Sequence, residues 1–282
     1  MRQTALLLIL ALTLAACGSE DSAEEPGGDG TSCAVEDLEL VTPGTLTIGT
    51  GEPVFPPWMI DDDPTNKQGY ESAVAYAVAN ELGFADEDVE WVRTGFDQVI
   101  APGPKDFDFN IQQFSITDAR DEVVDFSDGY YQVRQAIVAY EDSPAVGAST
   151  VADLQELRIG AQIGTTSLDY VENVIQPSTP AAVYDTNADA KAALDAGQVD
   201  ALVFDLPTAY FVTAVEIEGS QILGQLEEVG DEPEELGMLF AEGNTLVSCV
   251  NEALAALRAD GTLAELEEEW LAQGGDIPTI SR

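Results

Sequence analysis

Residues 113–131 read QFSITDARDEVVDFSDGYY, a stretch that places two hydroxyl side chains and one arginine around a predicted helical turn. It follows the apolar run at 107–111 (FDFNI), which predicts a strand that leads into a cleft. Ser115 and Thr117 precede the turn, where free backbone N–H groups and a partial positive charge suit a carboxylate. Arg120 adds a planar guanidinium that can hold a carboxylate with two hydrogen bonds. The alternative is a surface ion pair between Arg120 and an acidic neighbour in the same turn.

The pattern S-I-T-x-x-R followed by D-F-S-D-x-Y-Y resembles the signature of the family 3 extracellular solute-binding proteins, the amino-acid receptors of ABC importers. The resemblance extends from about Thr45 to Trp270. It implies an α/β protein with the two-lobed, type II periplasmic-binding-protein fold, in which each lobe is a sheet flanked by helices and two hinge strands join the lobes. Lobe 1 is expected at residues 33–132 and 233–282, and lobe 2 at residues 133–232.

The function implied by this resemblance is that of the extracytoplasmic substrate-binding component of an ABC importer. The protein would close its lobes around a small polar solute, an amino acid, and deliver it to a membrane permease as a monomer. We expect no enzymatic activity, no cofactor and no metal. Two alternatives stay open: a periplasmic dehydratase-like enzyme on the same fold, with Glu52 or Glu71 as the acid, and a ligand receptor for a sensor protein.

The resemblance also assigns partners to the two charged groups of an amino acid. Arg120, Ser115 and the backbone N–H of Thr166 would bind the carboxylate. Asp205, the Ser115 hydroxyl and the Gln113 carbonyl would bind the ammonium.

Both of the assigned residues beyond the opening stretch have a simpler explanation. Thr166 lies in a G-T-T-S stretch at a predicted helix start, so this stretch is also consistent with an ordinary N-cap. Asp205 ends the apolar run ALVFD at 201–205, which is typical of a buried strand with a polar tip. A plain helix cap explains that aspartate equally well.

Four further residues are expected at the ligand's side chain. Phe55 and Trp58 lie in a proline-rich loop after the strand predicted at 45–50, and simple packing is the alternative for both rings. Phe96 is expected to face the ligand from the opposite side, and Glu52 is the nearest acid after the first strand. Two departures from the family pattern, Gln113 and the proline–glycine break at 102–104, are expected to reshape the cleft.

The N-terminal segment carries the marks of export. Residues 1–17 have one arginine, an apolar run and small residues before Cys17, which predicts a lipoprotein signal peptide. The ending L-A-A-C resembles a bacterial lipobox, so Cys17 would be lipidated and would anchor the protein to the outer face of the cell membrane. A plain secretory signal is the alternative. Residues 18–32 are acidic and glycine-rich, as in a disordered tether.

Composition narrows the possible partners. With 53 acidic and 10 basic residues, the formal charge of −43 excludes nucleic acid as a natural partner. The chain has no histidine, which removes the commonest general base and metal ligand. Once Cys17 is assigned to lipid, Cys33 and Cys249 remain, and an oxidising compartment permits a disulfide between them. Two free buried thiols are the alternative.

Overall fold

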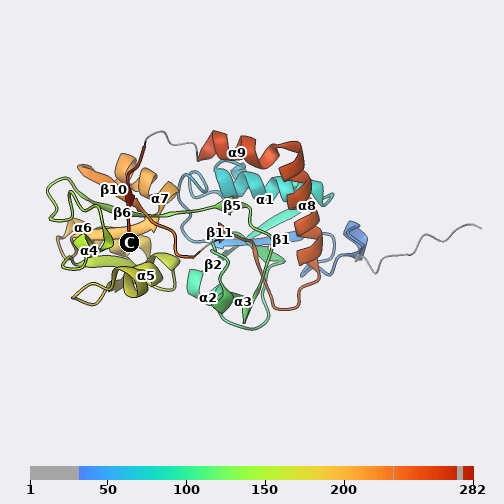
Figure 1. The fold of residues 1–282 in the computed structure, drawn as a ribbon. Helices are drawn as coiled ribbons and strands as arrows, with labels where there is room; N and C mark the ends of the chain where they lie inside the picture. Colours follow the sequence, from blue (N-terminus) through green and yellow to red (C-terminus); the bar gives the residue numbers. More distant parts are fainter. Residues whose placement is uncertain (1–31, 231, 272–275) are drawn as a thin grey trace, which may run out of the picture. The chain divides into compact units, whose positions relative to one another are not determined.

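The computed structural model describes residues 32–230, 232–271 and 276–282. The predicted signal peptide, Cys17 and all but one residue of the predicted tether lie outside these residues. Within them, no helix has the length and apolar character that crossing a membrane requires. From residue 31 onward the chain forms one compact unit, in which Figure 1 shows the elements of one sheet at the right and those of a second sheet at the left.

The strand predicted at 45–50 is present as β1 at Leu46–Gly51, and the first sheet includes it. Among the described residues its strand order is β2 (Val89–Thr94), β1 (Leu46–Gly51), β3 (Phe109–Asn110), β12 (Leu239–Phe240) and β4 (Asp125–Phe126). Strand β1 runs parallel to β2 and β3, whereas β12 is antiparallel to β3 and β4. The parallel strands end at the same edge, which is where the proline-rich loop and the stretch at 113–131 begin.

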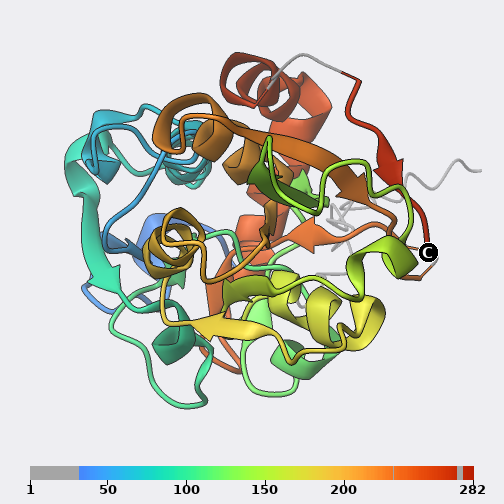
Figure 2. The ribbon, with the colours of Figure 1, turned by 90° about the vertical axis from the view of Figure 1, so that its left-hand side faces the viewer.

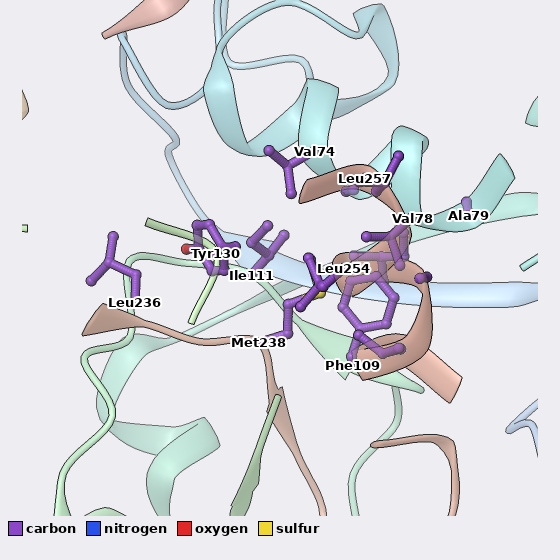
Figure 3. Close-up of a cluster of buried hydrophobic side chains, with 14 of the residues drawn as sticks. Val74, Val78, Ala79, Phe109, Ile111, Tyr130, Leu236, Met238, Leu254 and Leu257 are labelled. Carbon is purple, nitrogen blue, oxygen red and sulfur yellow. The ribbon is translucent and has the colours of Figure 1, made fainter. Parts of the chain in front are cut away.

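Helices cover this sheet: α1 (Tyr70–Glu81), α2 (Phe96–Ile100), α3 (Asp118–Asp121), α8 (Leu246–Asp260) and α9 (Thr262–Trp270). Val74 and Val78 are one turn apart on α1, so they share a face, and both are fully buried. Figure 3 shows them with Leu254 of α8 and with Phe109, in the core between helices and sheet. Helix α2 ends before the proline–glycine break at 102–104, in agreement with the sequence.

The second sheet has the order β13 (Thr279–Ile280), β10 (Ser220–Leu226), β6 (Gln135–Tyr140), β9 (Ala201–Asp205), β7 (Ile159–Gln162) and β8 (Ala182–Tyr184) within the described residues. Helices α4 (Val151–Leu154), α5 (Thr166–Tyr170), α6 (Asn187–Asp195) and α7 (Leu206–Phe211) belong to this lobe. Figure 2 turns the lobe toward the viewer. Leu202 and Phe204 pack into the core on one face, and Val203 into the core on the other. Burial on both faces explains why β9 reads as an unbroken apolar run.

Two short crossing strands, β5 (Tyr131–Gln132) and β11 (Glu235–Leu236), pair antiparallel with each other. They lie where the chain passes between the two sheets, as the sequence predicted. After helices α8 and α9, the C-terminal strand β13 pairs with β10 at the edge of the second sheet (Figure 2). Residues 233–282 were all expected in lobe 1, so the pairing of β13 in the second sheet is a departure from that expectation, and a strand of two residues has no local pattern that predicts it.

The disulfide between Cys33 and Cys249 is present. It joins the start of the described chain to α8, and Cys249 is buried in the core of lobe 1. The alternative of two free thiols is therefore wrong. The bridge crosses a separation of 216 residues, so it ties the two chain segments of lobe 1 together.

Candidate ligand-binding site

A cavity of about 350 Å³ lies between residues of the two lobes. This volume is in the range of small-molecule sites. The first lobe contributes the loop after β1 and the start of α2, and the second contributes the ends of β7, β8 and β9. The predicted site residues that line the cavity are Glu52, Phe55, Trp58, Phe96, Gln113 and Asp205.

The Glu71 carboxylate, which has no exposed surface, holds in place the loop that precedes Arg120. Glu71 accepts a hydrogen bond from the backbone N–H of Gln113 at 2.7 Å and one from the Tyr130 hydroxyl at 2.5 Å. The side-chain amide of Gln113 also donates to it. Burial raises the pKa of Glu71 to about 7. Gln113 has φ +51°, a left-handed conformation that this set of bonds holds in place.

Arg120 is buried and spans both lobes. It has only 8% of its surface exposed, and its guanidinium donates to the Ser115 carbonyl at 2.6 Å and to the Gly164 carbonyl at 2.8 Å. Within the described residues no carboxylate oxygen lies within 4.0 Å of it, so the surface ion pair is not formed. Burial lowers its pKa, although an arginine stays charged in a protein. Three of its five N–H groups have no hydrogen-bond partner in the described part of the chain, and Arg120 is not among the residues that line the 350 Å³ cavity.

The second lobe meets Arg120 at the G-T-T-S stretch. Gly164 has φ +73°, and a Cβ atom there would collide with the Asp97 carboxylate, so only glycine fits. The N-cap of α5 is Thr165, whose hydroxyl accepts from the N–H of Leu168 at 3.2 Å. Thr166 is therefore not the cap, and its hydroxyl lies 3.3 Å from that of Ser115 across the lobes.

Asp205 occupies the N-cap position of α7 without making a capping hydrogen bond, so the plain helix cap is wrong. Its Oδ1 atom instead accepts from the Gln135 amide at 2.8 Å, its partner in the register of β6 and β9. Burial, together with the nearby Glu234 carboxylate, raises the pKa of Asp205 to about 7. An incoming cation would relieve this charge.

The aromatic residues divide into packed and exposed members. Trp58 is buried with 2% exposed surface, packs edge-on against Tyr131 at 5.9 Å, and donates its indole N–H to Thr208 of the other lobe at 2.9 Å. Phe96 stacks on Phe114 and lies 5.7 Å from the Arg120 guanidinium. Phe55 is exposed at the entrance. Trp58 is thus core and cavity wall together, so the packing alternative and the ligand role do not exclude each other.

Two residues of the site were missed in the sequence. Gln135 begins β6 opposite Asp205, and a polar residue that starts an apolar strand was a usable signal. Glu234 lies in the second crossing and accepts hydrogen bonds from the Ser115 and Thr166 hydroxyls. No local sequence pattern around Glu234 predicts this role, because its two partners are 119 and 68 positions away in the sequence.

The arrangement of the two lobes and of the polar groups between them is typical of one class of protein, the two-lobed binding proteins. Arg120, two hydroxyls and Asp205 offer complementary partners to a small polar solute, and the lobes that supply them are joined by paired crossing strands. Among the described residues, no group of acids and cysteines could hold a metal ion. Such a molecule is a two-lobed binding protein that encloses its solute.

Residues 46–273 match the bacterial extracellular solute-binding proteins, family 3, and the chain belongs to this family. It is 27% identical over 237 residues to the L-cystine-binding protein TcyJ of Escherichia coli (strain K12), covering 83% of this chain and 84% of TcyJ. The structure is similar to an ancestral arginine-binding protein bound to glutamine, with a TM-score of 0.68, 31% identity, and coverage of 82% and 99%.

An ancestral amino-acid-binding protein described as a precursor of cyclohexadienyl dehydratase is also similar, with a TM-score of 0.66 and 30% identity. The match covers 80% of this chain and 95% of the ancestral protein. These likenesses confirm the predicted type II fold. The curated relatives at the head of the ranking are binding proteins, not enzymes.

Proposed function

We propose that this protein captures an amino acid by closing its two lobes and delivers it to the permease of an ABC importer. Arg120, Ser115 and the Thr166 N–H bind the carboxylate, while Asp205, Ser115 and the Gln113 carbonyl bind the ammonium. A buried zwitterion is tolerable only when both charges are paired. Because Arg120 and Asp205 come from different lobes, the ligand itself stabilises the closed state.

The proposed ligand has a positively charged side chain, because the cavity lining is negatively charged. The described lining includes no lysine or arginine. It includes four carboxylates: Glu52, Asp97, Asp185 and Asp205. Asp97 and Asp185 come from different lobes: burial raises the pKa of Asp97, the Arg120 charge lowers it, and the Asp185 carboxylate raises it further. A cation between them removes the repulsion, and Trp58 also lines the cavity, whereas the Phe55 ring already has the Lys191 ammonium 5.1 Å from its centroid.

Isothermal calorimetry with arginine, lysine, glutamine, cystine and glutamate tests this function. Arginine and lysine should bind most tightly, and Asp97→Asn together with Asp185→Asn should reduce that preference by about tenfold, as expected for lost charge pairs. A preference for glutamate would contradict the cationic assignment. Failure of every amino acid to bind would contradict the binding function itself.

Delivery to a permease requires the protein to stay at the membrane. Lipidation of Cys17 is proposed as the anchor, and the protein is proposed to act as a monomer at the outer face of the cell membrane. Cys17→Ser should release the protein or leave its precursor unprocessed, with the fold intact. Unchanged lipid labelling of this variant would contradict the anchor, and light scattering of the released form would test the monomer.

A dehydratase on the same fold has less support in this molecule. Glu71 is enclosed by Gln113 and Tyr130 and is not among the cavity-lining residues. Glu52 lines the cavity together with Asp97, Asp185 and Asp205, and the proposed function uses these carboxylates to bind the charges of an amino acid. Incubation with cyclohexadienyl acids should therefore give no product.

A further inference from the structure

The Glu234 side chain lies one residue before β11 and links the two lobes. Its Oε1 atom accepts hydrogen bonds from the Ser115 hydroxyl in lobe 1 at 2.5 Å and from the Thr166 hydroxyl in lobe 2 at 2.6 Å. The Gln135 amide lies 3.3 and 3.2 Å from its two oxygens. One carboxylate of the protein thus stands among groups from both lobes.

The Ser115 hydroxyl is itself a proposed ligand contact, whereas at Thr166 the proposed donor is the backbone N–H of the residue whose hydroxyl donates to Glu234. A hydroxyl has one hydrogen, so while it donates to Glu234 it cannot donate to a ligand oxygen. Two carboxylates in one partly dehydrated position also repel each other. The Glu234 carboxylate and a ligand carboxylate therefore compete for the Ser115 hydroxyl and for the space beside Thr166.

The surrounding charges favour exchange of one carboxylate for the other. Glu234 makes no ion pair with Arg120 within 4.0 Å, so the strongest carboxylate partner of the described site is left unused. A ligand carboxylate that also meets Arg120 gains charge-assisted hydrogen bonds that Glu234 does not make. An ammonium group, in contrast, finds Glu234 and Asp205 side by side on the same Gln135 amide.

We propose that Glu234 is a tethered occupant of the ligand-carboxylate subsite and thereby a specificity-determining residue. In the empty protein it joins Ser115 to Thr166 and holds the lobes closed. A ligand with a carboxylate must displace it, whereas an amine without a carboxylate binds with Glu234 still in place. The inference rests on the proposed function, because both concern the same site.

Calorimetry with arginine and agmatine, its counterpart without the carboxylate, tests the competition. Glu234→Ala should bind arginine about tenfold more tightly than the native protein, the effect of removing charge-assisted hydrogen bonds from the competing state. Agmatine should bind equally well or more weakly. Glu234→Gln, which keeps an oxygen acceptor without the charge, should shift arginine affinity in the same direction by less.

Glu232→Gln is the matched control. It removes one negative charge from the same crossing, where Glu232 is exposed and has no hydrogen bond to the Ser115 or Thr166 hydroxyl. Both affinities should stay unchanged in this variant. An equal gain in arginine affinity would mean that general charge, and not displacement from the hydroxyls, sets the effect, and would overturn the proposal.

Small-angle X-ray scattering gives a readout that needs no ligand. The empty Glu234→Ala protein should have a larger radius of gyration than the empty native protein, and the two should agree once arginine is bound. Equal radii without ligand, or weaker arginine binding by Glu234→Ala, would overturn the proposal. If no amino acid binds to either protein, the proposed function fails, and the scattering of the empty proteins still decides whether Glu234 holds the lobes closed.

Discussion

Arg120 and Asp205 carry opposite charges on different lobes, and each has its own ligand group in the proposed site. Arg120 keeps three N–H groups for a carboxylate, and Asp205 is held by one amide at the end of β9. Because the partners are separate, substitutions at the two positions should have distinguishable effects on ligands that lack one charged group.

Arg120→Ala should weaken amino-acid binding by roughly thirty-fold to several-thousand-fold, since truncating one partner of a buried charge pair costs about 2–5 kcal/mol. Asp205→Asn should weaken amino acids strongly but spare their desamino analogues, because the amide keeps the shape and loses the charge. Calorimetry with an amino acid and its desamino analogue measures both effects. Equal losses for both ligands in Asp205→Asn would show that Asp205 does not bind the ammonium.

The raised pKa of Asp205 predicts a pH dependence of binding. Below about 7 this carboxyl is largely protonated in the empty protein, and an ammonium ligand needs the ionised form, so binding must release a proton. The affinity for an amino acid should therefore rise as pH increases from 6 to 8. Glu234, Arg120 and Glu71 face the same group and contribute to its titration. Asp205→Asn should flatten the profile, and an unchanged profile in this variant would assign the titration to another residue.

The ligand loop is an element whose shape depends on one buried acid. Glu71 projects from α1 and bonds the backbone of Gln113, which has a positive φ, so the loop cannot relax without losing these bonds. The carboxyl group is thus a structural support for the loop that holds the proposed ligand contacts.

Glu71→Gln should change the pH dependence of stability. The pKa of Glu71 is raised from 4.5 to about 7 in the folded protein, so its contribution to stability is complete below 4.5 and is lost as pH rises through about 7. The variant should remove this loss, which amounts to about 3 kcal/mol. Urea unfolding of both proteins at pH 4.5 and pH 8 measures the difference. A stability difference between the two proteins that is the same at both pH values would show that Glu71 does not titrate in this range.

The disulfide between Cys33 and Cys249 acts on the whole fold, because it closes a loop of 216 residues. Replacing both cysteines by serine should lower the free energy of unfolding by about 4–5 kcal/mol in the chain-entropy model. Chemical denaturation measures this loss, and ligand affinity should be unchanged because the bridge lies in the lobe 1 core away from the cavity lining. Detection of two free thiols in the denatured soluble protein, without reductant, would contradict the bridge.

Most elements of this molecule were predictable, because each carries a local pattern. The run at 201–205 became β9 with the predicted bounds, and the strand predicted at 45–50 became β1, shifted by one residue. The family resemblance assigned Arg120, Ser115, Thr166 and Asp205 to one site; in the structure Arg120 donates to the Ser115 carbonyl and the Ser115 and Thr166 hydroxyls lie 3.3 Å apart, while Asp205 lines the cavity. Periods of 2 and 3.6 residues and the chemistry of strand ends are properties of short segments, so the sequence expresses them directly.

Tertiary structure alone decided which groups occupy the site together. Glu234 meets Ser115, Thr166 and Gln135 across separations of 119, 68 and 99 residues, and β13 returns to the second sheet after the helices of lobe 1. Neither the contacts of Glu234 nor the return of β13 is predicted by a local sequence pattern. Such contacts form because the crossing strands bring two separately folded lobes face to face, and their geometry depends on the closure of the whole chain and not on any one segment.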